Sequence, residues 1–416
     1  MNLTVCPSEL RGQIDAPSSK SLTQRAIAAG LLASGTTVIH RPSFCNDSLA
    51  AMGMARALGA KVTAESDRIT IQPGERAAGI VTLNCGESGL ALRMFTPIAA
   101  VLSENVILTG EGSLLRRPVT MITEALSQLG VMVESGAGLL PVRLSGRLKS
   151  GRALIDGSTG SQLLTGLLMA LPLAEGESRL DVANLTSKPY IGLTLDLLAR
   201  FGVTVENKDY RTFSIPGRQE FKAHDYTVEG DWSGAAFLLV AGALGGSVAV
   251  SNLNHESIQA DRAVLRVLED TGAVLTIEPE KITSSVSVLR SFAFDATDAP
   301  DLFPPLAALA AYCEGVSHIR GVGRLRHKES DRAEAIAGVL EAMKIAVRIR
   351  GDEMMITGGQ VQGAVVSSHN DHRIAMMAAV MAAGAAAPVT IAGAEAVAKS
   401  YPGFFDDLAR IGGKTG

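Results

Sequence analysis

The sequence predicts an α/β protein of two similar domains, each built from three repeats of roughly seventy residues. The first observation is length, because 416 residues exceed one ordinary domain. The second is a recurring pattern, in which a helix rich in small residues runs through a Gly or Pro break into a β-rich segment. The third is a row of glycines at matching intervals. Together they predict that strands alternate with helices along the whole chain.

The helix-to-strand pattern recurs at intervals of 67 to 73 residues. Alanine and glycine are frequent in these helices, so we expect buried helices with close backbone contacts. The segments are 21–39, 88–108, 161–180, 233–250, 301–319 and 371–391. A fixed spacing of this length indicates a repeat architecture, and three repeats per domain give domains of ordinary size.

A second series of helices, more clearly amphipathic, lies between the helices of the first. Most of its members end in glycine before a β-rich run, as expected where a left-handed residue terminates a helix. These glycines are Gly59, Gly130, Gly202, Gly272 and Gly412. The fifth member has Lys344 in that position instead. The last member, predicted over 402–411, has almost no chain after it, so its strand must come from elsewhere.

The N-terminus supplies the missing β-rich residues. Residues 1–5 and 13–15 precede the first repeat and have the composition of strands. We therefore expect them to complete the C-terminal domain, with two chain crossings near residues 18 and 229. The predicted domains are residues 19–229, and residues 1–18 together with 230–416.

Composition narrows the functional classes. The formal net charge of −4 argues against a protein that binds nucleic acid or a membrane surface. The four cysteines form no CxxC pair, so we expect free thiols in a reducing compartment. The N-terminus lacks the apolar region of a signal peptide, and 375–394 is mostly Ala and Gly with an internal Pro, unlike a membrane span. We therefore expect a cytoplasmic protein.

Cations recur at predicted helix starts, where exposed N–H groups already favour anions. The segment Lys328-Glu329-Ser330-Asp331-Arg332 opens a helix predicted over 330–343. Comparable positions hold Lys20 with Arg25, Gly89 with Arg93, Arg117 before Pro118, His372 with Arg373, and Lys399 before Pro402. Both prolines are expected at the first helical position. One such cation is usually a solvated surface charge, but their register with the repeats favours a site for small phosphate- and carboxylate-bearing anions.

Two further helix starts carry polar or acidic side chains in place of a cation. Ser161-Gln162 offers a hydroxyl and an amide at the start of the third repeat helix. Asp301, between Pro300 and Leu302, lies at the start of the fifth, and in isolation it is interpreted as an N-cap.

Taken in order, these motifs resemble the 5-enolpyruvylshikimate-3-phosphate (EPSP) synthase family across essentially the whole chain. The motifs are Pro17-Ser18-Ser19-Lys20-Ser21-x-x-x-Arg25, Gly89-x-x-x-Arg93, Arg117-Pro118, Ser161-Gln162, Ser187-Lys188-Pro189-Tyr190, Lys328-Glu329-Ser330-Asp331-Arg332, Asp371-His372-Arg373 and Lys399-x-x-Pro402. The resemblance implies two domains, each of three βαβαββ repeats in an inside-out α/β barrel, with the active site in the interdomain cleft.

The resemblance also implies an activity in aromatic amino-acid biosynthesis. The enolpyruvyl group of phosphoenolpyruvate would be transferred to the 5-hydroxyl of shikimate-3-phosphate, releasing phosphate, by addition and elimination without metal or cofactor. Asp301 would accept the hydroxyl proton, Glu329 would protonate the methylene carbon, and Lys20 would assist proton transfer or stabilise leaving phosphate. Shikimate-3-phosphate would be bound by Lys20, Ser21, Arg25, Gly160, Ser161, Gln162, Ser187, Tyr190, Asp301 and Lys328. Phosphoenolpyruvate would be bound by Lys20, Gly89, Arg117, Gln162, Arg332, Arg373 and Lys399.

The sequence departs from the family pattern at several positions. Gly160 stands where the family often has Ser, so that its backbone N–H would have to serve in place of a hydroxyl. Arg324 stands where Asn is common, and Met94 replaces a common Pro. The glycine loop has Glu87 two residues before Gly89. These departures leave substrate affinity open, together with sensitivity to glyphosate, the herbicide that targets this family.

Two alternatives remain. An enolpyruvyl transferase acting on UDP-N-acetylglucosamine would usually carry a reactive Cys, which residues 103–117 lack. A non-catalytic two-domain anion-binding protein would not need both Asp301 and Glu329. We expect a monomer whose partners are its two small-molecule substrates, and neither nucleic acid nor membrane.

Overall fold

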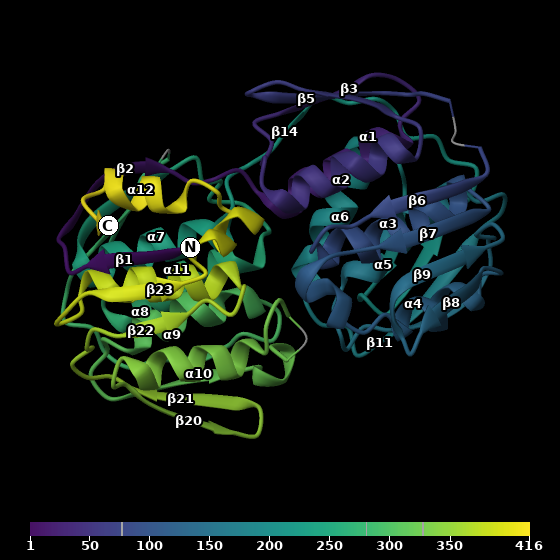
Figure 1. Cartoon of the computed structure of the whole chain (residues 1–416). Helices are drawn as coiled ribbons and strands as arrows, with labels where there is room; N and C mark the ends of the chain where they lie inside the picture. Colours follow the sequence, from purple (N-terminus) through teal and green to yellow (C-terminus); the bar gives the residue numbers. More distant parts are fainter. Residues whose placement is uncertain (76–77, 280, 327) are drawn as a thin grey trace. The chain divides into compact units, whose positions relative to one another are not determined.

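The computed structural model describes residues 1–75, 78–279, 281–326 and 328–416. The chain divides into two compact units, which Figure 1 shows in sequence colours. The first lobe is Ser18–Val228. The second lobe joins Met1–Pro17 to Glu229–Gly416.

The first lobe alternates two kinds of helix along the chain. The helices that open the repeats are α1 (Lys20–Leu32), α3 (Gly89–Leu102) and α5 (Gln162–Ala170), and those that follow are α2 (Asn46–Ala57), α4 (Thr120–Ser127) and α6 (Lys188–Arg200). Short 3₁₀ helices are η1 (Gly112–Arg116) and η2 (Leu171–Leu173). The opening helices consist mostly of buried residues, and α3 packs along α5 and against α1. Their small side chains allow this close packing, as predicted.

The strands described in the first lobe form three four-stranded sheets. In order across each sheet they are β14 (Tyr226–Thr227), β3 (Thr37–His40), β5 (Arg68–Gln72) and β4 (Lys61–Ala64); β6 (Ile80–Asn84), β7 (Asn105–Thr109), β9 (Leu139–Ser145) and β8 (Met132–Gly136); and β10 (Arg152–Asp156), β11 (Ser178–Ala183), β13 (Thr212–Ile215) and β12 (Glu206–Lys208). In each sheet a parallel pair is extended by antiparallel strands. The order β6-α3-β7-α4-β8-β9 confirms the predicted βαβαββ repeat.

The second lobe repeats this plan around buried helices. Its opening helices are α7 (Trp232–Gly245), α9 (Phe303–Ala310) and α11 (His372–Ala383), and the others are α8 (Val264–Thr271), α10 (Arg332–Ala342) and α12 (Phe404–Arg410). Its 3₁₀ helices are η3 (Ala260–Ala263), η4 (Pro300–Leu302), η5 (Val322–Arg324) and η6 (Ala394–Lys399). Helices α7, α9 and α11 pack on one another and are buried almost throughout, as expected for helices whose residues are mostly apolar on every side. Across the described residues, no helix combines the length and apolar character that a membrane crossing requires.

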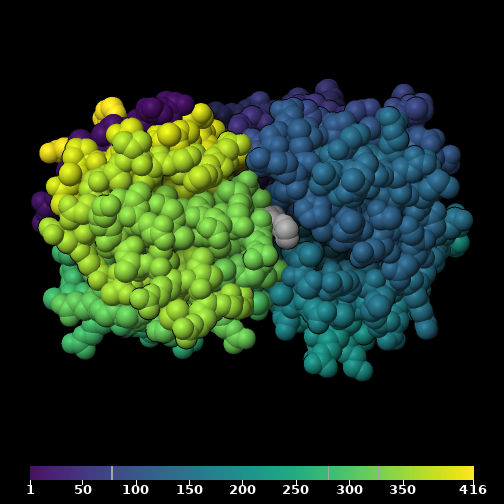
Figure 2. Space-filling model, turned by 60° about the horizontal axis from the view of Figure 1, so that its bottom comes forward, coloured from purple at the N-terminus to yellow at the C-terminus, as the bar shows by residue number. Residues whose placement is uncertain are grey.

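The N-terminal strands belong to the sheets of the second lobe. The sheets are β2 (Leu10–Asp15), β15 (Gly246–Ser251), β17 (Lys281–Ser285) and β16 (Val274–Ile277); β18 (Ala293–Asp295), β19 (Val316–Arg320), β21 (Glu353–Thr357) and β20 (Ala346–Arg350); and β22 (Val365–Ser367), β23 (Val389–Ala392), β1 (Asn2–Cys6) and β24 (Lys414–Thr415). Strand β1 runs antiparallel to β23, with Leu3 opposite Ile391, and β2 runs parallel to β15. Purple N-terminal and yellow C-terminal atoms therefore adjoin on this lobe in Figure 2.

The predicted helix-terminating glycines adopt left-handed backbone conformations. Their φ angles lie between 77° and 106° at Gly59, Gly130, Gly202, Gly272 and Gly412. Lys344 takes the same place in the fifth repeat with a φ of 65°, which is strained for a residue with a Cβ. The local requirement is therefore the same in every repeat, and the sequence meets it with glycine in all but one.

Three predicted helix starts are wrong by about half a turn. Helix α10 begins at Arg332 rather than residue 330, because the Asp331 side chain accepts a hydrogen bond from Glu334 N and caps it. Pro118 and Pro402 are not first helical residues, since α4 begins at Thr120 and α12 at Phe404. Before α4, Val119 donates its N–H to Gly138 O, and this tertiary bond overrides the local preference of proline.

Candidate active site

In the second lobe, predicted site residues gather around the carboxylate of Asp301. The 3₁₀ helix η4 carries this residue immediately before α9. Its Oδ1 accepts a hydrogen bond from Arg332 Nη1 at 2.9 Å, and its Oδ2 accepts one from Arg373 Nη2 at 3.1 Å. Lys328 Nζ lies 3.7 Å from Oδ1. Asp301 is therefore the centre of an ion-pair network rather than the helix cap that its position alone suggested.

Arg332 joins this carboxylate to two others. Its side chain is 1% exposed, and its Nη2 donates to Glu329 Oε2 at 2.6 Å. Its Nε donates to Asp371 Oδ2 at 3.0 Å. Asp371 is fully buried and caps α11 by accepting a hydrogen bond from Arg373 N. A buried guanidinium is stable only with such partners, so this arrangement requires all of its members.

The charges in this network control one another's protonation. Burial raises the pKa of Asp301, but Arg373, Lys328 and Arg332 together lower it below the usual range, so the group is a carboxylate at neutral pH. Burial lowers the pKa of Lys328 to about 8, although Asp301 opposes the shift. Burial also disfavours the charge of Arg332, but Asp371, Glu329 and Asp301 raise its pKa overall. Lys328 is thus the member that titrates closest to neutral pH among those with a resolved shift.

Lys399 lies at the other end of this group. It is the last residue of η6 and is buried, with its Nζ donating to Asn370 O at 2.6 Å. Asn370 precedes Asp371, the residue that caps α11 and binds Arg332. Lys399 is therefore linked to the network through the backbone that joins Asn370 to Asp371.

In the first lobe, Lys20 begins α1, which Ser19 caps by accepting a hydrogen bond from Leu22 N. Lys20 Nζ donates to Asp47 Oδ2 at 2.9 Å, and both side chains are largely buried. Asp47 lies in the first turn of α2, where the helix dipole stabilises a carboxylate. The ion pair fixes the lysine at the start of α1.

Arg25 lies one turn further along α1 and is 1% exposed. Its nitrogens donate to Ser21 O at 2.9 Å, to Thr194 Oγ1 at 3.1 Å and to Tyr190 O at 3.4 Å, with Thr165 Oγ1 at 3.5 Å. Burial lowers its pKa to about 10, because these acceptors are neutral oxygens. An anion bound here would replace neutral partners by a charged one.

At the start of α3, Gly89 lies directly against Arg117. A Cβ on Gly89 would come 2.5 Å from Arg117 Nη1 and 2.8 Å from its guanidinium carbon. The contact therefore requires glycine, since any side chain would displace the buried guanidinium. Ser88 caps the helix by accepting from Ala91 N, which leaves Gly89 at the first helical position.

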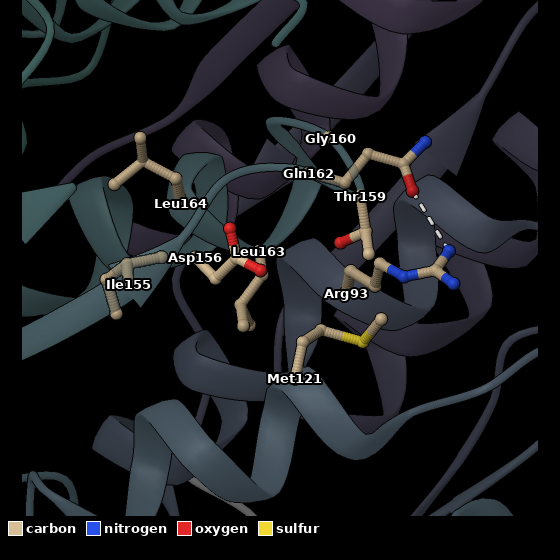
Figure 3. A pocket seen from close by; sticks show the side chains of 9 residues that line it. All are labelled: Arg93, Met121, Ile155, Asp156, Thr159, Gly160, Gln162, Leu163 and Leu164. Atoms are coloured by element: carbon tan, nitrogen blue, oxygen red, sulfur yellow. Dashed lines mark hydrogen bonds between the residues drawn. The ribbon is translucent and has the colours of Figure 1, made fainter. Parts of the chain in front are cut away.

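The remaining predicted residues lie at the starts of α5 and α6. Ser161 precedes α5, and Ser187 precedes α6 with a left-handed φ of 58°; both are buried. Gly160 has a φ of 133°, where a side chain would be strained, so serine would fit poorly at this backbone. Gly160 and Gln162 line a pocket of about 20 Å³ with Arg93, room for a single water (Figure 3).

Comparisons with known proteins identify the family. The sequence matches the family model described as EPSP synthase (3-phosphoshikimate 1-carboxyvinyltransferase) over residues 5–408. The chain belongs to the EPSP synthase family. A curated EPSP synthase relative, the 3-phosphoshikimate 1-carboxyvinyltransferase of Thermococcus kodakarensis, is 41% identical and covers 97% of this chain and 98% of its own. The same-named protein of Aeropyrum pernix is 40% identical, covering 99% and 96% respectively.

Solved structures show the same EPSP synthase fold. EPSP synthase from Acinetobacter baumannii has a TM-score of 0.84 and 27% identity, with 100% of this chain and 99% of that chain covered. The enolpyruvyl transferase NikO from Streptomyces tendae has a TM-score of 0.82 and 18% identity, with 100% and 98% covered. At that identity, NikO supports the fold alone.

Several residues that contact the candidate site residues were given no role in the site from the sequence. Asp47 and Asp371 pair with Lys20 and Arg332, yet an acidic residue at a helix start is ordinarily interpreted as a cap. Glu87 Oε2 accepts hydrogen bonds from Ser113 N at 2.8 Å and from Ser113 Oγ at 2.9 Å, which ties the glycine loop to η1. The sequence marked Glu87 only as a departure from the family pattern. It did not indicate that Ser113 would be its partner.

Proposed function

We propose that this chain is a 3-phosphoshikimate 1-carboxyvinyltransferase, which joins the enolpyruvyl group of phosphoenolpyruvate to shikimate-3-phosphate and releases phosphate. Family membership and the names of the curated relatives support this activity. The observation that carries the mechanism is the Asp301 carboxylate held between Arg332 and Arg373, with Glu329 on the same Arg332. Two acid groups among cations suit proton transfer between anionic substrates.

The proposal divides the site residues between two anions. Arg332, Arg373 and Lys399, with Gly89, Arg117, Gln162 and Lys20, would hold phosphoenolpyruvate. Lys328 and Asp301, with Lys20, Ser21, Arg25, Gly160, Ser161, Gln162, Ser187 and Tyr190, would hold shikimate-3-phosphate. In this proposal, residues 19–229, and residues 1–18 with 230–416, form two domains.

In the proposed reaction, the 5-hydroxyl oxygen of shikimate-3-phosphate attacks C2 of phosphoenolpyruvate. Asp301 accepts the hydroxyl proton while Glu329 gives a proton to C3, which becomes a methyl group in the tetrahedral intermediate. Elimination then breaks the bond between C2 and the phosphate oxygen. Glu329, deprotonated in the first step, takes a proton back from C3, the double bond re-forms, and Lys20 stabilises the departing phosphate.

In this proposal, binding of phosphoenolpyruvate makes Asp301 a better base by changing the charges around it. In the free protein, its neighbouring cations hold the pKa of Asp301 below the usual range, which makes it a weak proton acceptor. Arg332 and Arg373 are also proposed ligands of phosphoenolpyruvate. An anion bound to them offsets their positive charge, which lets the pKa of Asp301 rise toward the value that general base catalysis requires.

A phosphate-release assay tests this activity. The purified chain is expected to release phosphate from phosphoenolpyruvate when shikimate-3-phosphate is the acceptor, and not when UDP-N-acetylglucosamine is. Mass spectrometry should detect the enolpyruvyl ether in the first reaction. Phosphate release with UDP-N-acetylglucosamine but not with shikimate-3-phosphate would assign the chain to the other acceptor. Binding of phosphoenolpyruvate and shikimate-3-phosphate without product would support the anion-binding alternative.

Alkaline pH is expected to weaken binding of shikimate-3-phosphate. Burial lowers the pKa of Lys328 to about 8, so its cation is present below that pH and is lost above it. The KM for shikimate-3-phosphate should therefore rise above about pH 8, with a smaller change in the KM for phosphoenolpyruvate. The Lys328→Arg variant keeps its charge and should lose this alkaline limb. If the KM of Lys328→Arg for shikimate-3-phosphate also rises at alkaline pH, a group other than Lys328 causes the pH dependence.

A further inference from the structure

Arg93 connects three segments of the first lobe through one buried guanidinium. It lies one turn after Gly89 in α3, and it is 8% exposed. Its Nη1 donates to Gly89 O at 3.3 Å and to Gln162 Oε1 at 3.0 Å, the bond drawn in Figure 3. Its Nη2 donates to Pro118 O at 3.3 Å. These acceptors belong to the start of α3, the start of α5 and the segment before α4.

Each acceptor is, or directly adjoins, a residue proposed to bind phosphoenolpyruvate. Gly89 and Gln162 are themselves proposed ligands, and Pro118 follows the proposed ligand Arg117. The guanidinium of Arg117 also lies against the Cα of Gly89. Arg93 therefore holds the backbone on both sides of that contact, once at Gly89 O and once at Pro118 O.

The bond to Gln162 also sets the orientation of its amide. Because Arg93 can only donate, it selects the carbonyl oxygen of Gln162 as its partner and turns the amide NH₂ group away from itself, as Figure 3 shows. An anionic substrate requires donors rather than acceptors. Arg93 thus presents the end of Gln162 that a phosphate or carboxylate can use.

The segment that carries Arg117 is held at its other end as well. Glu87 binds Ser113 at the start of η1, and Arg93 binds Pro118 after its end. Arg117 lies between these two anchors. Its position over Gly89 then follows from the loop geometry rather than from the flexible arginine side chain alone.

We propose that Arg93 is a positioning residue for phosphoenolpyruvate, which acts by aligning Gly89, Arg117 and Gln162. This inference rests on the proposed function. A planar guanidinium reaches three acceptors in fixed directions, which an ammonium group on a flexible stem does not reproduce. Its loss leaves the charges of the proposed ligands in place but removes their alignment, and small misplacements of such groups have large kinetic costs.

The test compares Arg93→Met and Arg93→Lys with the wild type in steady-state kinetics. Both variants are expected to raise the KM for phosphoenolpyruvate by about ten- to a hundredfold, with a much smaller change in the KM for shikimate-3-phosphate. Arg56→Met is the matched control, because the exposed Arg56 also donates to a backbone carbonyl of this lobe, Val62 O. It should leave both KM values unchanged.

Chemical rescue separates positioning from a general structural role. In Arg93→Ala, guanidinium chloride at concentrations far below those that unfold proteins should lower the KM for phosphoenolpyruvate toward the wild-type value, and methylammonium should not. Neither salt should improve the wild type. Rescue by both cations alike would mean that charge alone matters, and it would overturn the proposal.

The wild-type assay separates failure of this inference from failure of the proposed function. A wild type without turnover defeats the proposed function, whatever Arg93 does. An active wild type with an unchanged KM for phosphoenolpyruvate in Arg93→Met defeats the inference alone. If circular dichroism shows that Arg93→Met does not fold, Arg93→Lys decides. A folded lysine variant with a raised KM for phosphoenolpyruvate supports the proposal, and one with the wild-type KM overturns it.

Discussion

Asp301→Asn is expected to lower kcat by about three orders of magnitude while the protein stays folded and binds both substrates. The amide keeps the shape of the carboxylate but cannot accept the hydroxyl proton. Arg332 retains Glu329 and Asp371 as partners, so the network does not lose its buried cation. Rapid-quench measurement of product formation should show that the chemical step itself is slowed.

The Asp301→Asn substitution should not weaken the binding of phosphoenolpyruvate, although it lowers kcat. Asp301 places a negative charge beside Arg332 and Arg373, the cations proposed to receive phosphoenolpyruvate. Its removal should preserve or strengthen binding of phosphoenolpyruvate in calorimetry. The control is Asp295→Asn, which alters a carboxylate of the same lobe that accepts a hydrogen bond from Thr297 N, and it should leave kcat unchanged. Turnover within about tenfold of the wild type in Asp301→Asn would exclude Asp301 as the base.

The repeat plan could be predicted from the sequence because it rests on local chemistry. Helices rich in small residues and their terminating glycines each follow from the backbone of one segment, and these features return every seventy residues or so. Lys344 shows the limit of such reasoning, because it takes the left-handed position without being glycine. Pro118 shows another, since a hydrogen bond from Val119 to a distant turn sets where α4 begins.

The cations of the site were also predictable, but their partners were not. Lys20 and Arg332 stood out because they break the charge preference of a helix start. Asp47 and Asp371 obey that preference, so their charges do not separate them from ordinary caps. Their ion pairs join residues 27 and 39 positions apart, and only the topology of the repeats brings them together. Arg93 and Gln162, 69 positions apart, meet for the same reason.

Arg332→Met is expected to destabilise the second lobe by about 3–5 kcal/mol, the usual cost of leaving buried charges without their partner. Methionine fills much of the volume but leaves Asp301, Glu329 and Asp371 facing one another without the guanidinium. Urea denaturation should show the loss at neutral pH. Arg348→Met, which removes an exposed arginine from the same lobe, should change stability by about 0.5 kcal/mol or less.

The pH dependence of that loss identifies its origin. The lowered pKa of Asp301 gives the wild type stability that is present at neutral pH and is lost as pH falls through the folded-state pKa. Without Arg332, the pKa of Asp301 is lowered less, so the variant loses less stability than the wild type when the pH falls. The stability gap between the two proteins should therefore narrow toward acidic pH. A gap independent of pH would mean that packing around the side chain, rather than its charge, holds this part of the lobe together.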